Sequence, residues 1–520
     1  MSAHRLRQVI LTITVIAAAM IELIDTSIVN VALTDMSGNL GATLEDVAWV
    51  VTSYAIANVI IIPMTSFLAA RLGRRNYYIG SILLFTAASV ACGSATNIWE
   101  LVAFRFIQGI GGGALIATSQ AILFEAYTIA QRGFASAMFG LGIFIGPTVG
   151  PTIGGWIIDH QSWPWIFYIN LPIGLAAAIL AYFYVAEPAQ TRRSDIIDWP
   201  GIGLLVVGLG SLQVVLERGE TEDWFATPYI VVLTLLAAAS LVTFIVHELR
   251  TPQPVVDLRI LRSRSLAVAA MLTFVLGFAL FATVFVVPVF AQRLLGFTAT
   301  DTGLLFLPGA VISILVLPLV GRLLTRGVPP SFMVVAGFGA VALFSGLLSG
   351  SSLAMGADDF FWPVILRSVG LCLLIVPLTQ LAVSGLEPAD IPQGTALNNM
   401  MRQLGGSFGI ALVNTYIAQR LASHRIDLIT HLVPGSPATD ARLQGLAASL
   451  QAHGSSPLDA ARQALGLLEN TVVGQATLLS YLDAFGIVAL LALVCMPLVF
   501  LAGRPKAASR AAASAAAEAH

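Results

Sequence analysis

The chain has 520 residues, of which 57% are hydrophobic and only 10% are charged, and its formal net charge at pH 7 is −2. Soluble domains carry about 25% charged residues, so this composition excludes a soluble globular protein and predicts a membrane protein with many spans. A net charge near zero gives no indication of nucleic-acid binding. The three cysteines, Cys92, Cys372 and Cys495, fall in apolar runs and predict neither a disulfide framework nor a metal site.

Apolar runs of about 20 residues, long enough for a helix to cross a bilayer, recur along the whole chain. No cleavable signal peptide is recognisable, so the first run is expected to be an uncleaved first span. The apolar pattern that predicts a span is weakest in the seventh run. In chain order, the sequence predicts fourteen spans near residues 10–33, 46–68, 77–96, 99–126, 134–158, 164–186, 200–216, 226–247, 267–291, 302–324, 332–350, 360–384, 395–420 and 479–502.

The distribution of basic residues predicts the orientation of these spans. Cytoplasmic loops of membrane proteins are enriched in Lys and Arg. With the N-terminus inside, most of the 26 Lys and Arg residues fall in segments that this arrangement places in the cytoplasm. We therefore expect both termini to be cytoplasmic. Residues 505–520 are rich in Ala and Ser and are expected to form a disordered cytoplasmic tail.

An internal repeat divides the chain into two halves. Four residues recur 255 positions later: Asp46, Pro63, Leu68 and Arg71 correspond to Asp301, Pro318, Leu323 and Arg326. Arg105 has a looser counterpart in Arg367. Two halves with the same orientation predict a transporter with a central path between them. We expect an N-terminal six-helix bundle at 1–195, an inserted helix pair at 196–250, and a C-terminal six-helix bundle at 251–504 that carries a long periplasmic loop at 421–478.

Charged side chains inside spans cost about 2.5–3.5 kcal/mol each on insertion scales, so each is expected to have a partner, water or a function. Glu22 and Asp25 lie three residues apart in the first span and therefore on one helical face. Asp25 and Arg105 lie at similar depths, so an ion pair between them is feasible. Two interpretations stay open at this point. The pair is either part of a proton-coupling site with Glu22 or a structural salt bridge between two spans.

Other polar side chains within spans are candidates for a substrate cavity, although interhelical hydrogen bonding is the default interpretation for each. Asn30 is rotated by about 140° from Asp25 around the helix, so it is not clearly on the same face. The cavity candidates are Asn30, Gln108, Gln213, Asn398 and Gln403. Further polar positions within spans are Asn58, Gln120, Gln380, Asn399, Arg402 and Asn414.

The fifth span carries the most distinctive pattern of the chain. Its glycines recur at a spacing of four, which places them on one helical face without side chains. Another helix can pack against such a face backbone to backbone, and the two prolines bend and stiffen the span. The string consists of Gly142, Gly146, Pro147, Gly150, Pro151, Gly154 and Gly155. By itself it is compatible with a role in packing alone.

Taken together, these segments resemble the EmrB/QacA type of the major facilitator superfamily, a family of fourteen-span drug:proton antiporters. The glycine string is similar to the antiporter motif in the fifth span of major facilitator exporters. Residues 105–113 are similar to the fourth-span motif whose arginine the family ties to proton transfer. The segment before the last span is most similar to Gram-negative EmrB proteins. Residues 24–33, 163–174 and 212–225 resemble further family signatures, although Thr34 stands where a proline is usual.

The loop after the second span resembles the gating loop of the superfamily. Its residues are Arg71, Gly73, Arg74 and Arg75. One departure is that Ala70 stands where the superfamily usually has an aspartate, which puts the charge network of the cytoplasmic gate in doubt. Glu125, at the end of the fourth span, is expected to be solvated.

The resemblance implies an all-α polytopic membrane protein with the major facilitator fold, built from two six-helix bundles plus two inserted helices. It implies a proton-coupled exporter of hydrophobic toxic compounds in the bacterial inner membrane, with Asp25 as the proton site, Glu22 assisting and Arg105 tuning it. A membrane-fusion protein and an outer-membrane channel are the implied partners. The nearest alternative is an exporter of one defined metabolite or siderophore, and a proton-coupled importer is less favoured.

Enzymatic function is not predicted. The sequence offers no metal-ligand cluster, no nucleophile with an adjacent base and no phosphate-binding loop. We therefore expect neither a cofactor nor a metal, and no drive by ATP.

Overall fold

The computed structural model describes residues 3–128, 131–186, 197–433 and 436–502. The regular structure of these ranges consists of helices. The α-helices are α1 (Ala3–Leu40), α2 (Leu44–Leu72), α3 (Arg74–Gly93), α4 (Ile98–Ala126), α5 (Arg132–His160), α6 (Trp165–Tyr168), α7 (Asn170–Tyr184), α8 (Trp199–Arg218), α9 (Pro228–Arg250), α10 (Arg264–Arg293), α11 (Ala299–Leu305), α12 (Leu307–Thr325), α13 (Pro330–Leu348), α14 (Phe361–Val383), α15 (Ile391–Thr430), α16 (Pro437–Ala452) and α17 (Pro457–Leu498).

The prediction of an all-helical protein with many spans is confirmed. Within the described ranges, 12 helical segments are long and apolar enough to cross a membrane, with α6 and α7 counted as one and α11 and α12 as another. Helices α5 and α15 have 29 and 40 residues and coincide with the fifth and thirteenth predicted spans. The weakest predicted span forms α8, which begins where the Asp198 side chain accepts a hydrogen bond from the Gly201 amide.

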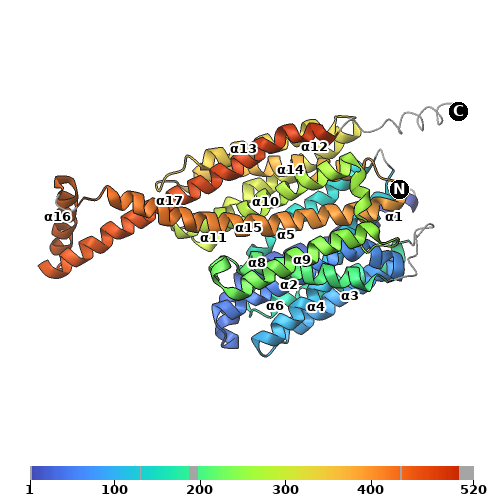
Figure 1. Ribbon diagram of the computed structural model, residues 1–520, viewed down its shortest axis with the longest axis horizontal. Coiled ribbons are helices and arrows are strands. Elements are labelled where there is room, and N and C mark those ends of the chain that lie inside the picture. Colours follow the sequence, from blue (N-terminus) through green and yellow to red (C-terminus); the bar gives the residue numbers. More distant parts are fainter. Residues whose placement is uncertain (1–2, 129–130, 187–196, 434–435, 503–520) are drawn as a thin grey trace.

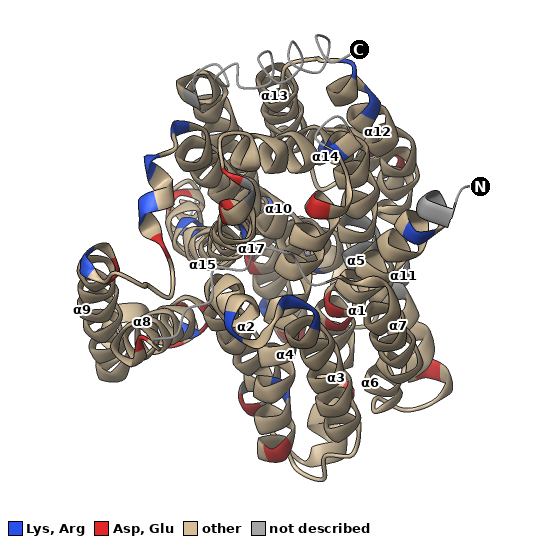
Figure 2. Cartoon of the chain, turned by 90° about the vertical axis from the view of Figure 1, so that its right-hand side faces the viewer, with Lys and Arg blue, Asp and Glu red and all other residues tan. Residues whose placement is uncertain are grey.

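The helices form two groups that lie side by side along a common axis (Figure 1). Helices α1 to α7 make one group and α10 to α17 the other, and the two meet where α5 packs on α12 and α2 packs on α15. Helix α1 begins and α17 finishes at the same end of the bundle, which we call the terminal face (Figure 1). Figure 2 looks onto this face, where arginines mark several helix ends. Helices α8 and α9 pack on each other at the side of the bundle, and α8 contacts α2 and α15.

The described part of the segment predicted as a long periplasmic loop, residues 421–478, is largely helical. Helix α15 continues to Thr430, α16 occupies part of the interval, and α17 already begins at Pro457. Ser436 and Ser456 cap α16 and α17 by accepting hydrogen bonds from backbone amides, and the following prolines favour helix starts. The segment forms a helical projection beyond the bundle (Figure 1). Its polar composition includes many good helix formers, mostly Ala, Leu and Gln. The tail predicted at 505–520 lies outside the described residues.

Candidate functional site

The glycine face of α5 packs directly on α1, the helix that carries Glu22 and Asp25. A Cβ added at Gly142 would lie 2.9 Å from Ile16, and one at Gly146 would lie 2.7 Å from Leu23. Side chains at Gly150 and Gly154 would collide with Ser27 and Ile28 in the same way. The face therefore fixes the position of α1 through close backbone approach.

The remaining members of the string do not take part in this contact. A Cβ added at Gly155 would meet nothing within 4 Å, and Pro151 is exposed. The side chain of Pro147 lies outside the described part of the structure.

A second set of glycines, on α4, lets α2 approach α4 closely. A Cβ at Gly109 would lie 2.6 Å from the Tyr54 carbonyl, and one at Gly113 would lie 2.8 Å from the Asn58 carbonyl. At Gly112 it would collide with the hydroxyl of Tyr54 and lie 3.4 Å from Cγ of Glu22. The missing side chains of α4 therefore make room for Tyr54 beside the acidic face of α1.

Asp25 forms a buried ion pair with Arg105. The similar depths of the two residues in their predicted spans make this pair feasible. Arg105 Nη1 donates to Asp25 Oδ2 at 2.5 Å, and the two side chains are 1% and 0% exposed. Asp25 Oδ1 accepts from Gln108 Nε2 at 2.9 Å and from Asn170 Nδ2 at 2.9 Å. Three donors from α4 and α7 thus converge on one carboxylate of α1. The charge of Asp25 is therefore paired, and both of its oxygens accept hydrogen bonds.

Arg105 is held by groups other than Asp25 as well. Its Nε donates to the Val50 carbonyl at 3.2 Å, and its Nη1 also donates to Gln108 Oε1 at 2.7 Å. The guanidinium lies over the Tyr54 ring, 4.2 Å from the ring centroid. These contacts position the arginine on both sides and stabilise its charge within the bundle.

Glu22, one helical turn before Asp25, has fewer partners. Its Oε1 accepts from Asn58 Nδ2 at 3.1 Å and from the Tyr54 hydroxyl at 3.4 Å. Its Oε2 is buried and has no hydrogen-bond partner. Tyr54 therefore connects the two acidic groups, with its hydroxyl on Glu22 and its ring under Arg105. Glu22 can take up a proton on Oε2 without breaking a hydrogen bond.

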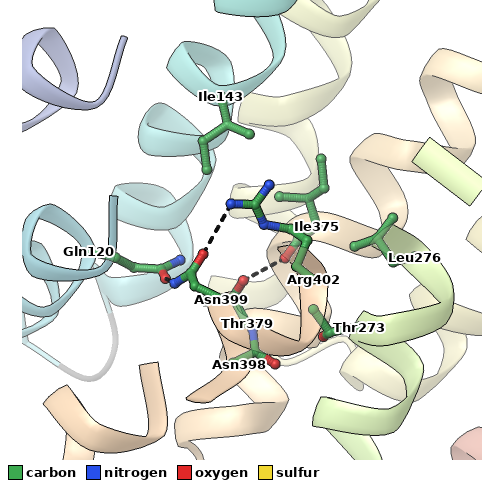
Figure 3. Close-up of a pocket in the computed structure, with 9 residues that line it drawn as sticks. All are labelled: Gln120, Ile143, Thr273, Leu276, Ile375, Thr379, Asn398, Asn399 and Arg402. Atoms are coloured by element: carbon green, nitrogen blue, oxygen red, sulfur yellow. Dashed lines mark hydrogen bonds between the residues drawn. The ribbon is translucent and has the colours of Figure 1, made fainter. Parts of the chain in front are cut away.

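Arg402 of α15 reaches this region from the other half of the molecule. It is 7% exposed, its charge interacts with that of Glu22, and its Nη2 donates to Asn399 Oδ1 at 3.3 Å. It lines a small cavity between the halves (Figure 3). The other lining residues are Gln120, Ile143, Thr273, Leu276, Ile375, Thr379, Asn398 and Asn399. The buried Thr273 Oγ1 and Asn398 Oδ1 have no partner, so the cavity offers unused polar groups on apolar walls.

Toward the terminal face the two halves are joined across this cavity. Asn399 Nδ2 donates to Gln120 Oε1 at 2.8 Å, and Gln380 Nε2 donates to Ser136 Oγ at 2.7 Å. Nearer that face α5 and α12 touch: a Cβ at Gly321 would lie 2.8 Å from that of Ala137. The side chains of α4 from residue 111 to 124 are all buried. The structure is therefore closed at the terminal face.

The residues that the sequence suggests for a substrate cavity lie in different parts of the structure. Asn398 lines the cavity, whereas Gln108 belongs to the Asp25 network. Asn30 is exposed and donates to the Thr26 carbonyl of its own helix at 3.4 Å. Gln213 lies on α8, where it donates to Glu217 at 2.9 Å, away from the lining residues. Gln403 neighbours Arg402 but does not line the cavity.

The loop between α2 and α3 has an acidic partner at the end of α4. Arg74 forms an ion pair with Glu125 at the end of α4, and Glu125 is exposed, so it has this partner in addition to solvent. Arg75 donates to the Tyr182 carbonyl and lies over its ring. Gly73 has φ 84°, which favours glycine at this turn. Arg71 lies in the last turn of α2 and is exposed. Glu125 therefore supplies an acidic group near the loop in which Ala70 replaces the usual aspartate.

Several members of the site are not predicted from the sequence. Tyr54 does not stand out there because an aromatic residue in an apolar span is usually a packing residue. Asn170 is brought to Asp25 only by the packing of α7 on α1, and Ser89, which accepts a hydrogen bond from Asn170 at 3.0 Å, by the packing of α3 on α7. Asn58 and Arg402 are recognisable only as polar positions. The glycines of α4, opposite Tyr54, are the available signal for a close helix contact.

Comparison with known proteins assigns the family. The sequence pattern of the Major Facilitator Superfamily matches residues 15–410. The chain belongs to this superfamily. Fatty acid resistance protein FarB of Neisseria gonorrhoeae is 34% identical over 489 residues, covering 94% of each chain. Multidrug export protein EmrB of Escherichia coli K12 is 32% identical over 505 residues, covering 96% of each. The EmrB-like resemblance is thus confirmed.

The fold is confirmed independently of these sequences. The human organic anion transporter MFSD10 (TETRAN) has a crystal structure that superposes with a TM-score of 0.59, at 14% identity, over 95% of this chain and 99% of that one.

Colistin resistance protein EmrB of Acinetobacter baumannii is a further relative by sequence, 29% identical over 93% of this chain and 94% of its own. This major facilitator protein is therefore a multi-pass membrane protein from a family of transporters.

Proposed function

We propose that this protein exports hydrophobic toxic compounds of varied structure from the cytoplasm in exchange for protons. The names of its relatives, which refer to multidrug export and to resistance against fatty acids and colistin, support the cargo class. The observation that carries proton exchange is the pair of acidic groups on α1. Asp25 is paired with Arg105 and accepts hydrogen bonds on both oxygens, whereas Glu22 has a buried oxygen without a hydrogen-bond partner.

In this proposal Glu22 carries the exchanged proton. Its Oε2 is unpartnered, and its charge interacts with Arg402 of the opposite half. A proton on Glu22 removes that interaction, which changes the balance between two arrangements of the halves. The sequence favours Asp25 with Glu22 assisting, whereas the geometry supports the reverse order.

In this proposal Asp25 and Arg105 hold the site in place and do not exchange the proton. They tie α1 to α4, and through Tyr54 they orient the hydrogen bond to Glu22. The glycine face of α5 holds α1 in this position. Arg105 therefore tunes the proton site without exchanging a proton itself.

The cargo is proposed to bind at the cavity lined by Arg402 (Figure 3). Apolar side chains such as Ile143, Leu276 and Ile375 suit hydrophobic compounds, and the unpartnered Thr273 and Asn398 offer hydrogen bonds. The site lies between the halves, next to contacts that close the terminal face. Loss of the contacts that close the terminal face would open the cavity to that face.

The setting of the transporter is proposed from the charge distribution and the relatives. Arginines on the terminal face support a cytoplasmic position of that face, and hence of both chain ends (Figure 2). The helical projection made by α16 and the ends of α15 and α17 would then lie in the periplasm. It is a suitable contact for a membrane-fusion protein that leads to an outer-membrane channel.

The experiment uses everted membrane vesicles with an acid interior. Addition of a hydrophobic drug to vesicles with the wild-type protein is expected to release protons, and vesicles without the protein are the control. An exporter of one defined metabolite would give no release with a panel of drugs, together with no resistance in cells. Net drug uptake by whole cells would support an importer instead.

A further inference from the structure

The end of α8 and the turn that follows it, residues 218–227, lie at the end of the bundle opposite the terminal face, and we call them the outer strap (Figure 1). On one side the outer strap contacts α15 of the second group of helices. Trp224 Nε1 donates to Thr415 Oγ1 at 3.0 Å. Glu220 Oε2 accepts from Asn414 Nδ2 at 2.9 Å. The outer strap is therefore hydrogen-bonded to the C-terminal half.

On its other side the outer strap contacts α2 of the first group. The guanidinium of Arg218 lies 5.5 Å from the centroid of the Trp49 ring. The next residue of α2, Val50, accepts a hydrogen bond from Arg105 Nε through its carbonyl at 3.2 Å. The outer strap therefore holds the part of α2 that contacts Arg105, and it joins this part to the opposite half.

The backbone of the outer strap has an unusual conformation. Asp223 and Trp224 have φ of 52° and 49°, in the left-handed region, which is unfavourable for residues other than glycine. Such a conformation persists only where the surroundings fix it. Here the Trp224 ring lies on Gly219, where an added Cβ would be 2.6 Å from the ring, and the Trp224 amide donates to the Gly219 carbonyl. The indole N–H is thus held in position to reach α15.

The two halves meet along α2 and α15 as well as along α5 and α12. In this structure the terminal face is closed. Transport from one side to the other needs a second arrangement, in which the contacts at that face separate and the halves are tilted relative to each other. Such a tilt changes the separation of α2 and α15 at the outer end, where the outer strap bridges them. Its hydrogen bonds to α15 therefore belong to the arrangement with the closed terminal face.

We propose that the outer strap stabilises the arrangement that is closed at the terminal face, and that the hydrogen bonds of Trp224 and Glu220 with α15 break when that face opens. Contacts that exist in only one arrangement shift the population toward it. The inserted helix pair thereby regulates access to the cavity between the halves. This inference rests on the proposed export function, which requires two arrangements, and gives the inserted pair a role in it.

The test measures opening of the terminal face in everted membrane vesicles, which expose the cytoplasmic side. Gln120→Cys, in a background without the three native cysteines, reports opening through its rate of reaction with a membrane-impermeant maleimide. Trp224→Phe keeps an aromatic ring and removes the N–H donor, so it should increase this rate about two- to tenfold, as for the loss of one neutral hydrogen bond. Trp199→Phe is the matched control, because Trp199 is exposed at the start of the same helix, and it should leave the rate unchanged.

A second variant tests the acceptor of the same hydrogen bond. Thr415→Val has nearly the same shape and lacks the hydroxyl, so it should raise the rate as Trp224→Phe does. The double variant should show no further increase, because both changes remove one and the same hydrogen bond. Thr471→Val is the matched control, since Thr415 and Thr471 each donate to a carbonyl one turn earlier in their own helix, and Thr471 is exposed.

An unchanged or slower reaction in either Trp224→Phe or Thr415→Val would overturn the inference, as would effects that multiply in the double variant. The proposed export function fails separately. Wild-type vesicles without drug-induced proton release, in which both variants still accelerate the reaction at Gln120→Cys, would contradict proton exchange and leave the role of the outer strap standing.

Discussion

Glu22 and Asp25 lie on one face of α1, one helical turn apart, yet only Asp25 is paired with an arginine. Arg105 is 2.5 Å from Asp25, whereas the nearest hydrogen-bonded groups of Glu22 are the uncharged Asn58 and Tyr54. The two acidic groups therefore have different tasks in the proposed exchange. Asp25 holds the helices, and Glu22 exchanges the proton.

Loss of the Asp25 carboxylate should destabilise the protein. Asp25→Leu leaves Arg105 buried without its ion-pair partner, which costs about 3–5 kcal/mol for a buried pair. Thermal unfolding of the detergent-solubilised protein should show a clearly lower midpoint than the wild type. Exchange of the two residues, Asp25→Arg with Arg105→Asp, should recover part of the loss. An unchanged midpoint in Asp25→Leu would contradict a structural role.

The contact between α5 and α1 should be sensitive to size at one glycine and insensitive at its neighbour. Gly150→Leu forces a side chain into Ser27 and should reduce transport, with an overpacking cost of about 1–3 kcal/mol. Gly155→Leu is the matched control because a Cβ there meets nothing within 4 Å. Drug resistance of cells that produce equal amounts of each variant is the measurement. Equal resistance would show that the glycine face does not position α1.

A disulfide across the closed terminal face should stop transport reversibly. A Cβ at Gly321 would lie 2.8 Å from that of Ala137, and a disulfide needs a separation of about 3.8 Å, so a small shift is enough. Ala137→Cys with Gly321→Cys, in a background that lacks the three native cysteines, is expected to lose transport on oxidation and regain it with reductant. Each single cysteine variant is the control. Continued transport by the fully oxidised double variant would mean that this face need not open.

A role of the salt bridge between Arg74 and Glu125 in closing the terminal face can be tested at Glu125. Glu125→Gln removes the ion pair with Arg74 and should weaken closure at the terminal face. A cysteine placed at Gln120 should then react faster with a water-soluble thiol reagent added at that face. The control is Asp35→Gln, an exposed carboxylate at the other end of α1. Similar reaction rates in wild type and Glu125→Gln would exclude Glu125 from the gate.

The sequence is sufficient to predict the class of fold because apolar runs and basic loops follow directly from the chemistry of the bilayer. The pair of Asp25 and Arg105 is predictable from depth alone, since both charges need a partner. The roles of Asn170 and Tyr54 are not, because their approach depends on how α7 and α2 pack. The helices within residues 421–478 are harder to predict, because a polar helix outside the membrane lacks the apolar run that marks a span.

The most direct test of the proton site compares Glu22→Gln and Asp25→Asn in everted vesicles with an acid interior. Glu22→Gln should bind drug but give no drug-induced proton release, because the exchanging group has been removed. Asp25→Asn, measured at matched amounts of folded protein, should retain measurable release. Proton release that persists in Glu22→Gln and disappears in Asp25→Asn would contradict the assignment and return the proton site to Asp25.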